Sequence, residues 1–484
     1  MNSRALLVSL TAALALAGCV SSHGLHPRGH LTETDALRTE RTYAGPLSPA
    51  TWPRGDWWNG LGDARLDELI REGLASSPDL QVVAARARQA DAAVLAAAAE
   101  RLPEIGLNAD VTRSRLSRVD DPAGAGERYS TLRSLAVQGG YTFDLWGGQR
   151  DAWEAALGRA RAGEVDQQAA RLTLATDIAR AYNDLGLAHT NLAIAEQDLK
   201  RTRDMLDLSQ RRVAAGLDSE YQLQQTQSLE AASQAALTGA KQQVRSARIR
   251  LAVLLGQGPD RGDELPKPAL IAPAAVNLPP QLPAELVGRR PDLVAARWRV
   301  EAAAKDIDAT KTEFYPNLNL NLAAGVKSLL GDAMLAAPSR YFNLGPALSL
   351  PIFDGGRRRA DLAAADADYD LAVATYNQTL VRALGDVGDL ITRLRAFDEQ
   401  VLQQQRARDI ARSSYDIALR RYGEGIGSYL DSLTVEQQLL QAERQLASVE
   451  AQRIDSAMLL MQALGGGFQP SITPPAAPAA DRTH

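Results

Sequence analysis

Residues 178–213, IARAYNDLGLAHTNLAIAEQDLKRTRDMLDLSQRRV, place an apolar side chain at every seventh position. These positions are Ile178, Leu185, Leu192, Leu199, Leu206 and Val213. A second row of mostly small residues lies three positions after the first five of them: Ala181, Ala188, Ala195, Thr202 and Ser209. A strict seven-residue repeat of this kind is typical of a coiled-coil seam, and small residues let neighbouring helices approach closely. The stretch therefore predicts a long helix packed along other helices.

This helix is too long for a compact globular domain. No proline occurs from Gln149 to Arg212, and at about 1.5 Å per residue that segment would reach roughly 95 Å. Gly216 then provides a left-handed C-cap, and Ser219 provides the N-cap of a return helix that ends near Leu255. We predict a helix hairpin over about residues 149–255.

The hairpin is present twice. Val387, Leu394 and Val401 repeat the seven-residue spacing 209 positions later. Further pairs of landmarks follow in the same order: Pro78 and Pro291, Pro103 and Pro316, Phe143 and Phe353, Arg212 and Arg421, and Leu255 and Leu464. Repeated landmarks in one order indicate an internal duplication. We assign residues 56–265 to the first repeat, 266–467 to the second repeat with a hairpin over about 356–464, and 468–484 to a Pro/Ala-rich flexible tail.

Each repeat also contains two short segments with a period of two. Residues 317–322 alternate asparagine and leucine, which predicts a strand over about 317–330 with one apolar and one polar face. Its partner is expected over about 341–353, with Leu344, Leu348, Leu350 and Ile352 on the apolar face. The first repeat has equivalent segments at about 104–118 and 130–146. Such strands can lie with one side in lipid and the other in water, although a small soluble β-domain that buries the leucines is an alternative.

Four strands cannot close into a membrane barrel. The smallest bacterial barrels have about eight strands, and an open sheet edge in lipid leaves backbone groups without hydrogen bonds. We therefore expect a barrel that is shared between chains. Two chains would supply about eight strands and three would supply about twelve, with room for a channel. Both remain open on physical grounds, and the predicted fold class is mainly α with a small membrane β-barrel part.

The first residues indicate the compartment. Arg4 precedes an apolar run, and Leu16-Ala17-Gly18-Cys19 ends it with the one cysteine of the chain. This pattern is typical of a bacterial lipoprotein signal, although a plain secretory signal remains an alternative. The thiol of Cys19 would take the lipid, and Val20 resembles the residue found in lipoproteins sorted to the outer membrane. We assign residues 1–18 to the signal peptide and 19–55 to a lipidated N-terminal linker.

Composition and motifs argue against several function classes. The formal net charge of −5, from 53 basic and 58 acidic residues, provides no footprint for nucleic acid. No nucleophile elbow, phosphate loop or metal-ligand cluster occurs in the sequence. His23, His26 and His30 have spacings that can bind a metal, and we interpret them as part of a soluble flexible tether. The chain is thus expected to be no enzyme and to use no cofactor or metal.

The duplicated strand and helix order, the Arg-x-x-x-Gly tips and the final Leu464 to Gly467 motif resemble the outer-membrane efflux protein family, the TolC-like channels. The resemblance is greatest to the lipoprotein branch that includes OprM and NodT, and it spans about residues 56–467. It implies a homotrimer with a shared twelve-stranded barrel in outer-membrane lipid and a twelve-helix tunnel in the periplasm. It also implies docking to a periplasmic adaptor (membrane fusion) protein and an inner-membrane pump of the RND or similar type.

Carried onto this chain, the resemblance implies two adaptor-docking tips and a gate. The tips are Arg212, Gly216 and Ser219 in the first repeat and Arg421, Gly425 and Ser428 in the second. The gate lies just after the second tip, where the lipoprotein branch has Leu, Asp and Arg on successive turns. Here Leu430 matches, but Thr434 and Gln437 stand at the two charged positions, and the neighbouring Asp431 and Glu436 could supply charge instead.

The sequence thus predicts a non-enzymatic outer-membrane channel that is lipid-anchored and extends into the periplasm. Its expected role is a passive exit duct for drugs or other small molecules in a tripartite efflux system. Two alternatives remain. One is the exit duct of a type I protein-secretion system, and the other is a periplasmic coiled-coil scaffold, which leaves the amphipathic strands unexplained.

Overall fold

The computed structural model describes residues 21–33, 37–39, 55–115, 129–268, 288–329 and 334–469, together with positions 42, 117 and 119. The expected signal peptide, Cys19 and residues 470–484 lie outside the described residues. The chain divides into two compact units. The first comprises Met1–Leu31, Arg86–Gly163 and Ala295–Asn377, and the second comprises Thr32–Ala85, Glu164–Val294 and Gln378–His484.

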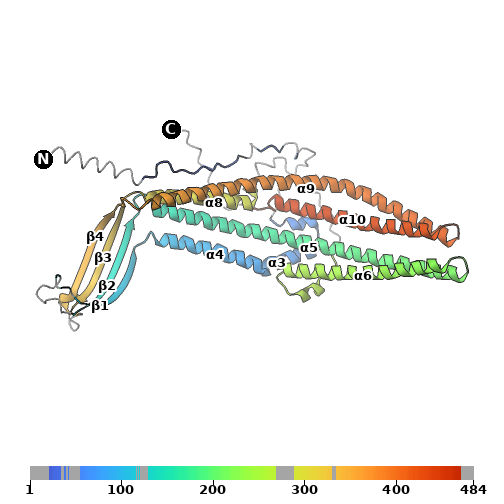
Figure 1. The fold of residues 1–484 in the computed structure, drawn as a ribbon, viewed down its shortest axis with the longest axis horizontal. Helices are drawn as coiled ribbons and strands as arrows, with labels where there is room; N and C mark the ends of the chain where they lie inside the picture. Colours follow the sequence, from blue (N-terminus) through green and yellow to red (C-terminus); the bar gives the residue numbers. More distant parts are fainter. Residues whose placement is uncertain are drawn as a thin grey trace. The chain divides into compact units, whose positions relative to one another are not determined.

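The first unit contains an antiparallel sheet of four strands in the order β1-β2-β3-β4 (Figure 1). The strands are β1 (Glu104–Arg115), β2 (Tyr129–Phe143), β3 (Asn317–Ser328) and β4 (Arg340–Ser349). The pairing gathers the apolar side chains on one face. Two rows that cross all four strands are Ile105, Gly139, Leu322 and Leu344, then Leu107, Val137, Ala324 and Phe342. Many of these side chains are exposed, Leu344 to 67% and Phe342 to 79%, so the protomer presents an apolar sheet face.

Polar groups lie on the other face of the sheet. Asn319 is paired with Thr142 across β2 and β3, and the Thr142 hydroxyl donates to the Asn319 side-chain oxygen at 2.7 Å. The alternation of leucine and asparagine in β3 therefore separates an apolar from a polar face, as the period of two predicts. The outer edges of β1 and β4 have no partner strand among the described residues.

The expected bounds of β4 and β2 were too long at the end next to the helices. β4 ends at Ser349, which pairs with Asn317, so Leu350, Ile352 and Phe353 lie beyond the sheet. Pairing stops there because β3 begins directly after Pro316, which has no N–H to donate. β2 ends at Phe143 rather than near residue 146. β1 and β3 also end two to three residues earlier than expected, at Arg115 and Ser328.

Aromatic side chains cluster where the sheet meets the helices. The Trp146 indole donates to the carbonyl of Pro316 at 2.8 Å and stacks on Tyr315 with ring centroids 4.9 Å apart. Tyr141 and Phe143 make an edge-to-face pair at 4.9 Å. Aromatic side chains with one polar group suit a boundary between apolar and polar surroundings.

The helices repeat with matching lengths in the two copies. α4 (Pro78–Ala99) and α8 (Pro291–Thr312) both have 22 residues, and the long helices α5 (Gly148–Ala214) and α9 (Arg357–Gly423) both have 67. The return helices α6 (Glu220–Leu254) and α10 (Tyr429–Ala463) both have 35 residues. These equal lengths confirm the duplication. Within the described residues, no helix is both long and apolar enough to cross a membrane.

All six apolar positions of the seven-residue seam of α5 are buried or half-buried. Ile178, Leu185 and Leu199 are buried, and so are all five small residues of the second row. In the second copy Val387 is fully buried, followed toward the tip by buried Tyr415 and Tyr422. Small side chains in the second row let α5 pack tightly, which explains why alanine dominates this helix.

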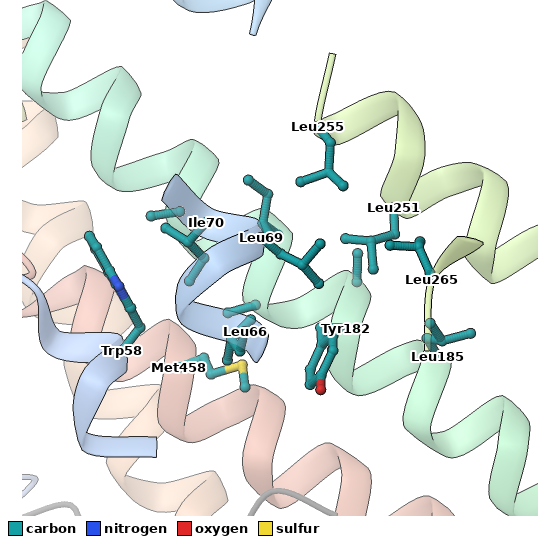
Figure 2. Packing of buried hydrophobic residues seen from close by; sticks show 14 of the residues in the cluster. Trp58, Leu66, Leu69, Ile70, Tyr182, Leu185, Leu251, Leu255, Leu265 and Met458 are labelled. Atoms are coloured by element: carbon teal, nitrogen blue, oxygen red, sulfur yellow. The ribbon is translucent and has the colours of Figure 1, made fainter. Parts of the chain in front are cut away.

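The main apolar cluster of the second unit joins both copies. α3 (Ala64–Ser76) supplies Leu66, Leu69 and Ile70, which pack against α5, α6 and Met458 of α10 (Figure 2). Asp63 caps α3 by accepting from the Arg65 and Leu66 N–H groups, and its other oxygen accepts the Tyr182 hydroxyl at 2.7 Å. This cluster holds the hairpins of the two copies together far from their tips.

Candidate functional site

Both hairpin tips turn at a glycine in the left-handed region. Gly216 has φ +69° and Gly425 has φ +78°. At the first tip the Leu217 N–H donates to the Arg212 carbonyl, and at the second the Ile426 N–H donates to the Arg421 carbonyl. Glycine adopts this conformation without the steric penalty of a Cβ, so the local sequence determines both turns.

A serine begins each return helix. The N–H of Ser219 donates to the Gln222 side chain at 2.7 Å, and Ser428 accepts from the Leu430 N–H at 3.2 Å. Both serines thus occupy the N-cap positions expected from the sequence. Each cap lies three residues after its glycine and fixes where the return helix starts, at Glu220 for α6 and at Tyr429 for α10.

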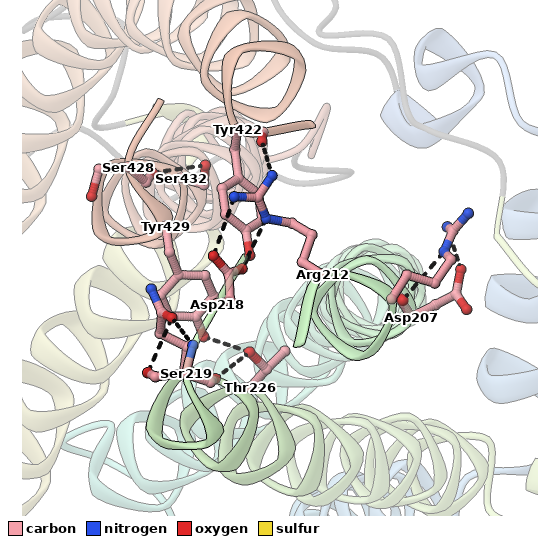
Figure 3. Close-up of polar contacts among 11 residues, drawn as sticks. Asp207, Arg212, Asp218, Ser219, Thr226, Tyr422, Ser428, Tyr429 and Ser432 are labelled. Carbon is pink, nitrogen blue, oxygen red and sulfur yellow. Dashed lines mark hydrogen bonds and ion pairs between the residues drawn. The ribbon is translucent and has the colours of Figure 1, made fainter. Parts of the chain in front are cut away.

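An ion pair at the first tip, which the sequence does not predict, joins the two copies through hydrogen bonds to Tyr422. Arg212 makes a two-pronged contact to Asp218, with Nε–Oδ2 at 2.9 Å and Nη2–Oδ1 at 3.2 Å (Figure 3). From the second copy, the Tyr422 hydroxyl donates to Asp218 at 2.6 Å, and the Tyr422 carbonyl accepts from Arg212 at 3.1 Å. The guanidinium also lies 4.7 Å above the Tyr422 ring. Arg212 therefore holds the second tip against the first.

The charges in this network stabilise one another. The hydrogen bond from Arg212 lowers the pKa of the Asp218 carboxyl, and Asp218 raises the pKa of Arg212. Burial raises the pKa of Tyr422. The side chains of Arg212 and Asp218 are only 14% and 5% exposed, so the pair is shielded from solvent. Removing one partner of such a pair costs about 3 to 5 kcal/mol, because the other charge stays buried.

Tyr429 makes a second bridge between the copies. Its hydroxyl lies 2.7 Å from the Thr226 hydroxyl of α6, and its ring lies 5.8 Å from the Tyr422 ring. One difference between the copies marks the region where they meet. Asp218 corresponds to Gly427 in the second copy at the offset of 209, so the copies differ where they meet. A Cβ at Gly427 would come within 2.9 Å of Arg421, which explains the glycine.

Beyond this network the tips expose apolar side chains. Leu217 and Tyr221 of the first tip are 66% and 68% exposed, and Ile426 and Leu430 of the second are both 66% exposed. Arg421 is exposed as well. Leu217 and Ile426 occupy equivalent positions, as do Tyr221 and Leu430. We call these four apolar side chains the tip surface.

The expected gate residues fall on different sides of α10. Leu430, Asp431 and Thr434 are all exposed in the protomer, and the Thr434 hydroxyl donates to the Leu430 carbonyl at 2.8 Å. Glu436 is only 3% exposed. The suggestion that Glu436 replaces the missing pore charge is therefore wrong, because its side chain lies inside the helix packing.

The N-terminal segment that was expected to be a flexible tether is held along α9. Arg359 donates to the carbonyls of Ser21 and His23, and one carboxylate oxygen of Asp370 accepts the N–H groups of Arg28 and Gly29 at 2.8 and 2.6 Å. Farther along α9, Asn377 donates to the His30 carbonyl at 2.8 Å. These three side chains share one helix face. We call residues 21–30 the strap, and it runs in the same direction as α9.

Within the described residues no cluster could hold a metal ion.

Comparison with known proteins shows the family of the chain. The sequence matches the family described as Outer membrane efflux protein over residues 69–257 and 282–466. The chain belongs to this family. It is 36% identical over 368 residues to the fusaric acid resistance protein FusA of Burkholderia cepacia, covering 75% of this chain and 69% of that protein. It is 31% identical over 438 residues to the multidrug resistance outer membrane protein MdtP of Escherichia coli (strain K12), covering 87% and 88%.

A solved structure shows the same fold. The outer membrane protein VceC of Vibrio cholerae superposes with a TM-score of 0.79 at 33% identity, covering 86% of this chain and 100% of that chain. The prediction of a TolC-like channel is therefore confirmed. The protein is an outer-membrane efflux channel and not an enzyme.

Proposed function

We propose that the chain forms a homotrimeric exit duct of a tripartite system, in which the two hairpin tips dock a periplasmic adaptor linked to an inner-membrane pump of the RND or similar type. The observation that carries this proposal is the exposed tip surface. Leu217, Tyr221, Ile426 and Leu430 present apolar side chains on turns that the Arg212–Asp218–Tyr422 network holds in place. Exposed apolar side chains grouped on a rigid element are typical of a protein-binding surface.

The cargo is proposed to be small organic molecules. FusA is named for resistance to fusaric acid and MdtP for multidrug resistance, and both are related to this chain over most of its length. These names favour drug-like compounds over the protein cargo of a type I secretion system. A periplasmic scaffold leaves the exposed apolar face of the four-stranded sheet without a role.

The gate and the lipid anchor complete the proposal. Three inward-facing copies of Leu430 would form an apolar constriction that resists wetting, and Thr434 would add hydroxyls one turn on. Lipid on Cys19 would anchor the chain to the membrane. The position of the strap supports this, because residue 21 lies beside Arg359, close to the start of α9 and to the end of β4. Asp370 and Asn377 hold the strap in this direction.

The docking proposal is tested by a bulky residue at each tip glycine. Gly216→Trp and Gly425→Trp should leave the channel folded, because a Cβ in a left-handed turn costs about 1 kcal/mol. Within 4 Å the added Cβ would meet nothing at Gly216 and only the Arg212 guanidinium, at 4.0 Å, at Gly425. We expect both variants to reach the outer membrane and to lose export, measured as drug sensitivity of cells.

A matched control is Gly62→Trp, since Gly62 also has positive φ (+72°) and open space around it but lies at the start of α3. It should retain export. Cysteines at Ser219 and Ser428 should crosslink to the adaptor in cells. Normal export by both tip variants would refute docking at the tips.

A further inference from the structure

A group of charged side chains is buried between α5 and α10, two to four turns from the second tip. Glu436, Asp198 and Glu443 are 3%, 6% and 8% exposed. Arg201 lies among them, with its side chain 14% exposed. Three acidic residues surround one deeply placed guanidinium. Neither the tip surface nor the gate makes use of this group.

The hydrogen bonds of Arg201 go to a single carboxylate. Its Nη1 and Nη2 donate to Glu443 Oε2 at 3.4 and 3.3 Å, and Arg412 of α9 donates to the other oxygen of Glu443 at 3.0 Å. Asp198 accepts the Ser233 hydroxyl of α6 at 3.0 Å and lies 3.8 Å from Arg201. Glu443 and Asp198 are therefore both satisfied.

Glu436 differs from these two carboxylates. Its Oε1 lies 4.0 Å from Arg201 Nε, too far for a hydrogen bond, and neither of its oxygens accepts a hydrogen bond from the described residues. A buried carboxylate without donors is strongly disfavoured in its charged form. A carboxyl that carries a proton removes the charge and avoids this penalty.

The groups that face Glu436 come from three directions. α5 contributes Asp198 and Arg201, α9 contributes Tyr415, and α10 itself contributes Tyr429. Glu443 and Arg412 are reached through Arg201, and the uncharged Ser233 of α6 is reached through Asp198. Burial raises the pKa of Glu436 from 4.5 to about 7, with Asp198 adding to the rise and Arg201 opposing it.

We propose that Glu436 is a proton-binding site that holds α10 against α5 while the proton is bound and favours their separation when the proton leaves. Separation of the two helices would hydrate Glu436, so that it ionises like an ordinary glutamate. Glu436 is on the buried side of α10, whose exposed side carries Leu430 and Thr434, so the same movement would open the entrance of the tunnel. This inference rests on the proposed gate at the second tip.

The direction of the pH effect follows from the raised pKa. The packed state binds the proton more tightly than the separated state, so the proton favours packing most at low pH. This advantage is lost as the pH rises from about 4.5 to about 7, and above that the ratio of packed to separated helices no longer changes with pH. The difference between 4.5 and about 7 changes the ratio of packed to separated helices by at most roughly 300-fold. Asp218 acts in the opposite direction and at lower pH, because its pKa is lowered.

The test is the conductance of the purified full-length channel in planar bilayers from pH 5 to pH 8. We expect conductance to rise with pH in the native channel. Glu436→Gln keeps the size of the side chain but cannot ionise, so this variant should stay at the low conductance across the whole range. Glu399→Gln removes an exposed glutamate of α9 and should behave like the native channel. Asp198→Asn should move the midpoint to lower pH, since it removes the neighbouring charge and keeps the acceptor for Ser233.

A native channel without a pH response, a Glu436→Gln channel with the native response, or an unchanged midpoint in Asp198→Asn would each overturn the proposal. The variant Leu430→Ser distinguishes a failure of the proton-site proposal from a failure of the proposed gate. If Leu430→Ser raises conductance while Glu436→Gln keeps the native pH response, the gate stands and the proton site is refuted. If neither variant differs from the native channel, the second tip does not control the entrance and the proton site falls with it.

Discussion

Leu430 and Asp431 are adjacent at the start of α10 and point about 100° apart around the helix. Both side chains therefore cannot face the axis of a channel. Both are exposed in the protomer, whereas Glu436 is buried. For the proposed gate, the choice is thus between an apolar ring of Leu430 and an acidic ring of Asp431.

We expect Leu430→Ser to raise conductance in planar bilayers and to sensitise cells to large antibiotics, because a hydroxyl lets water enter a ring that leucine keeps dry. Asp431→Asn should change conductance little and serves as the control on the neighbouring position. A closed pore in Leu430→Ser together with an open or less cation-selective pore in Asp431→Asn would reverse the assignment.

Arg212 shows how a residue expected to dock a partner can have an internal role. The sequence places it at a tip, but the structure pairs it with Asp218 and with Tyr422 of the other copy. Arg421, at the equivalent position of the second copy, is exposed instead. Of the two tip arginines, Arg421 is thus available to a partner, while Arg212 keeps the tips together.

At the scale of elements, the strands carry the clearest difference between two faces. Leu320 is paired with Tyr141 and Pro346 on the apolar face, and the neighbouring Asn319 accepts a hydrogen bond from Thr142 on the polar face. In an outer-membrane channel the apolar face lies against lipid and the polar face against water. Adjacent residues of β3 therefore make a matched pair of test positions.

Leu320→Arg should impair assembly, because a charge on the lipid face costs roughly 2 to 4 kcal/mol per chain near the midplane. Asn319→Arg should lose one hydrogen bond and still assemble. The amount of heat-modifiable oligomer in unheated detergent gels measures both. Equal assembly would contradict the assignment of the faces, and poorer assembly of Asn319→Arg would mean that the faces are inverted.

The hairpins show why the spacing of residues along the chain predicts the buried side and the ends of helices well. Seven-residue spacing identified the buried side of α5, and each glycine and serine of the tips lies within three residues of the helix ends it was expected to set. Strand ends were predicted less well. β4 stops at Ser349 because its partner starts after Pro316, and a pairing partner cannot be read from the strand itself.

At the scale of the whole molecule, the open sheet edges require further chains. β1 and β4 each leave one side without a partner among the described residues, and lipid offers no hydrogen bonds to the backbone groups there. Copies of the same chain can pair β4 with β1, and three copies would give about twelve strands around a channel. The proposed homotrimer satisfies both edges.

Lipidation of Cys19 would anchor the N-terminal part of each chain to the membrane. We expect labelled palmitate to enter the native chain and not Cys19→Ser, because only a thiol at this position can accept the lipid. The control is Cys19→Ser combined with Ser21→Cys, which restores a thiol two residues away and should remain unlabelled. Equal labelling of the native chain and Cys19→Ser would refute the lipoprotein assignment.

The sequence by itself determined the duplication, the helix hairpins with their glycine turns, the two faces of the strands and the family. All of these depend on spacing along the chain, because periods of seven and two report which side of an element is buried. The tertiary structure alone decided which charges meet. Asp218 with Tyr422, Arg201 with Glu443, and Asp370 with the strap join residues more than 200 positions apart. Local patterns carry no information on such contacts, because they depend on how the two copies pack against each other and on where the strap lies along α9.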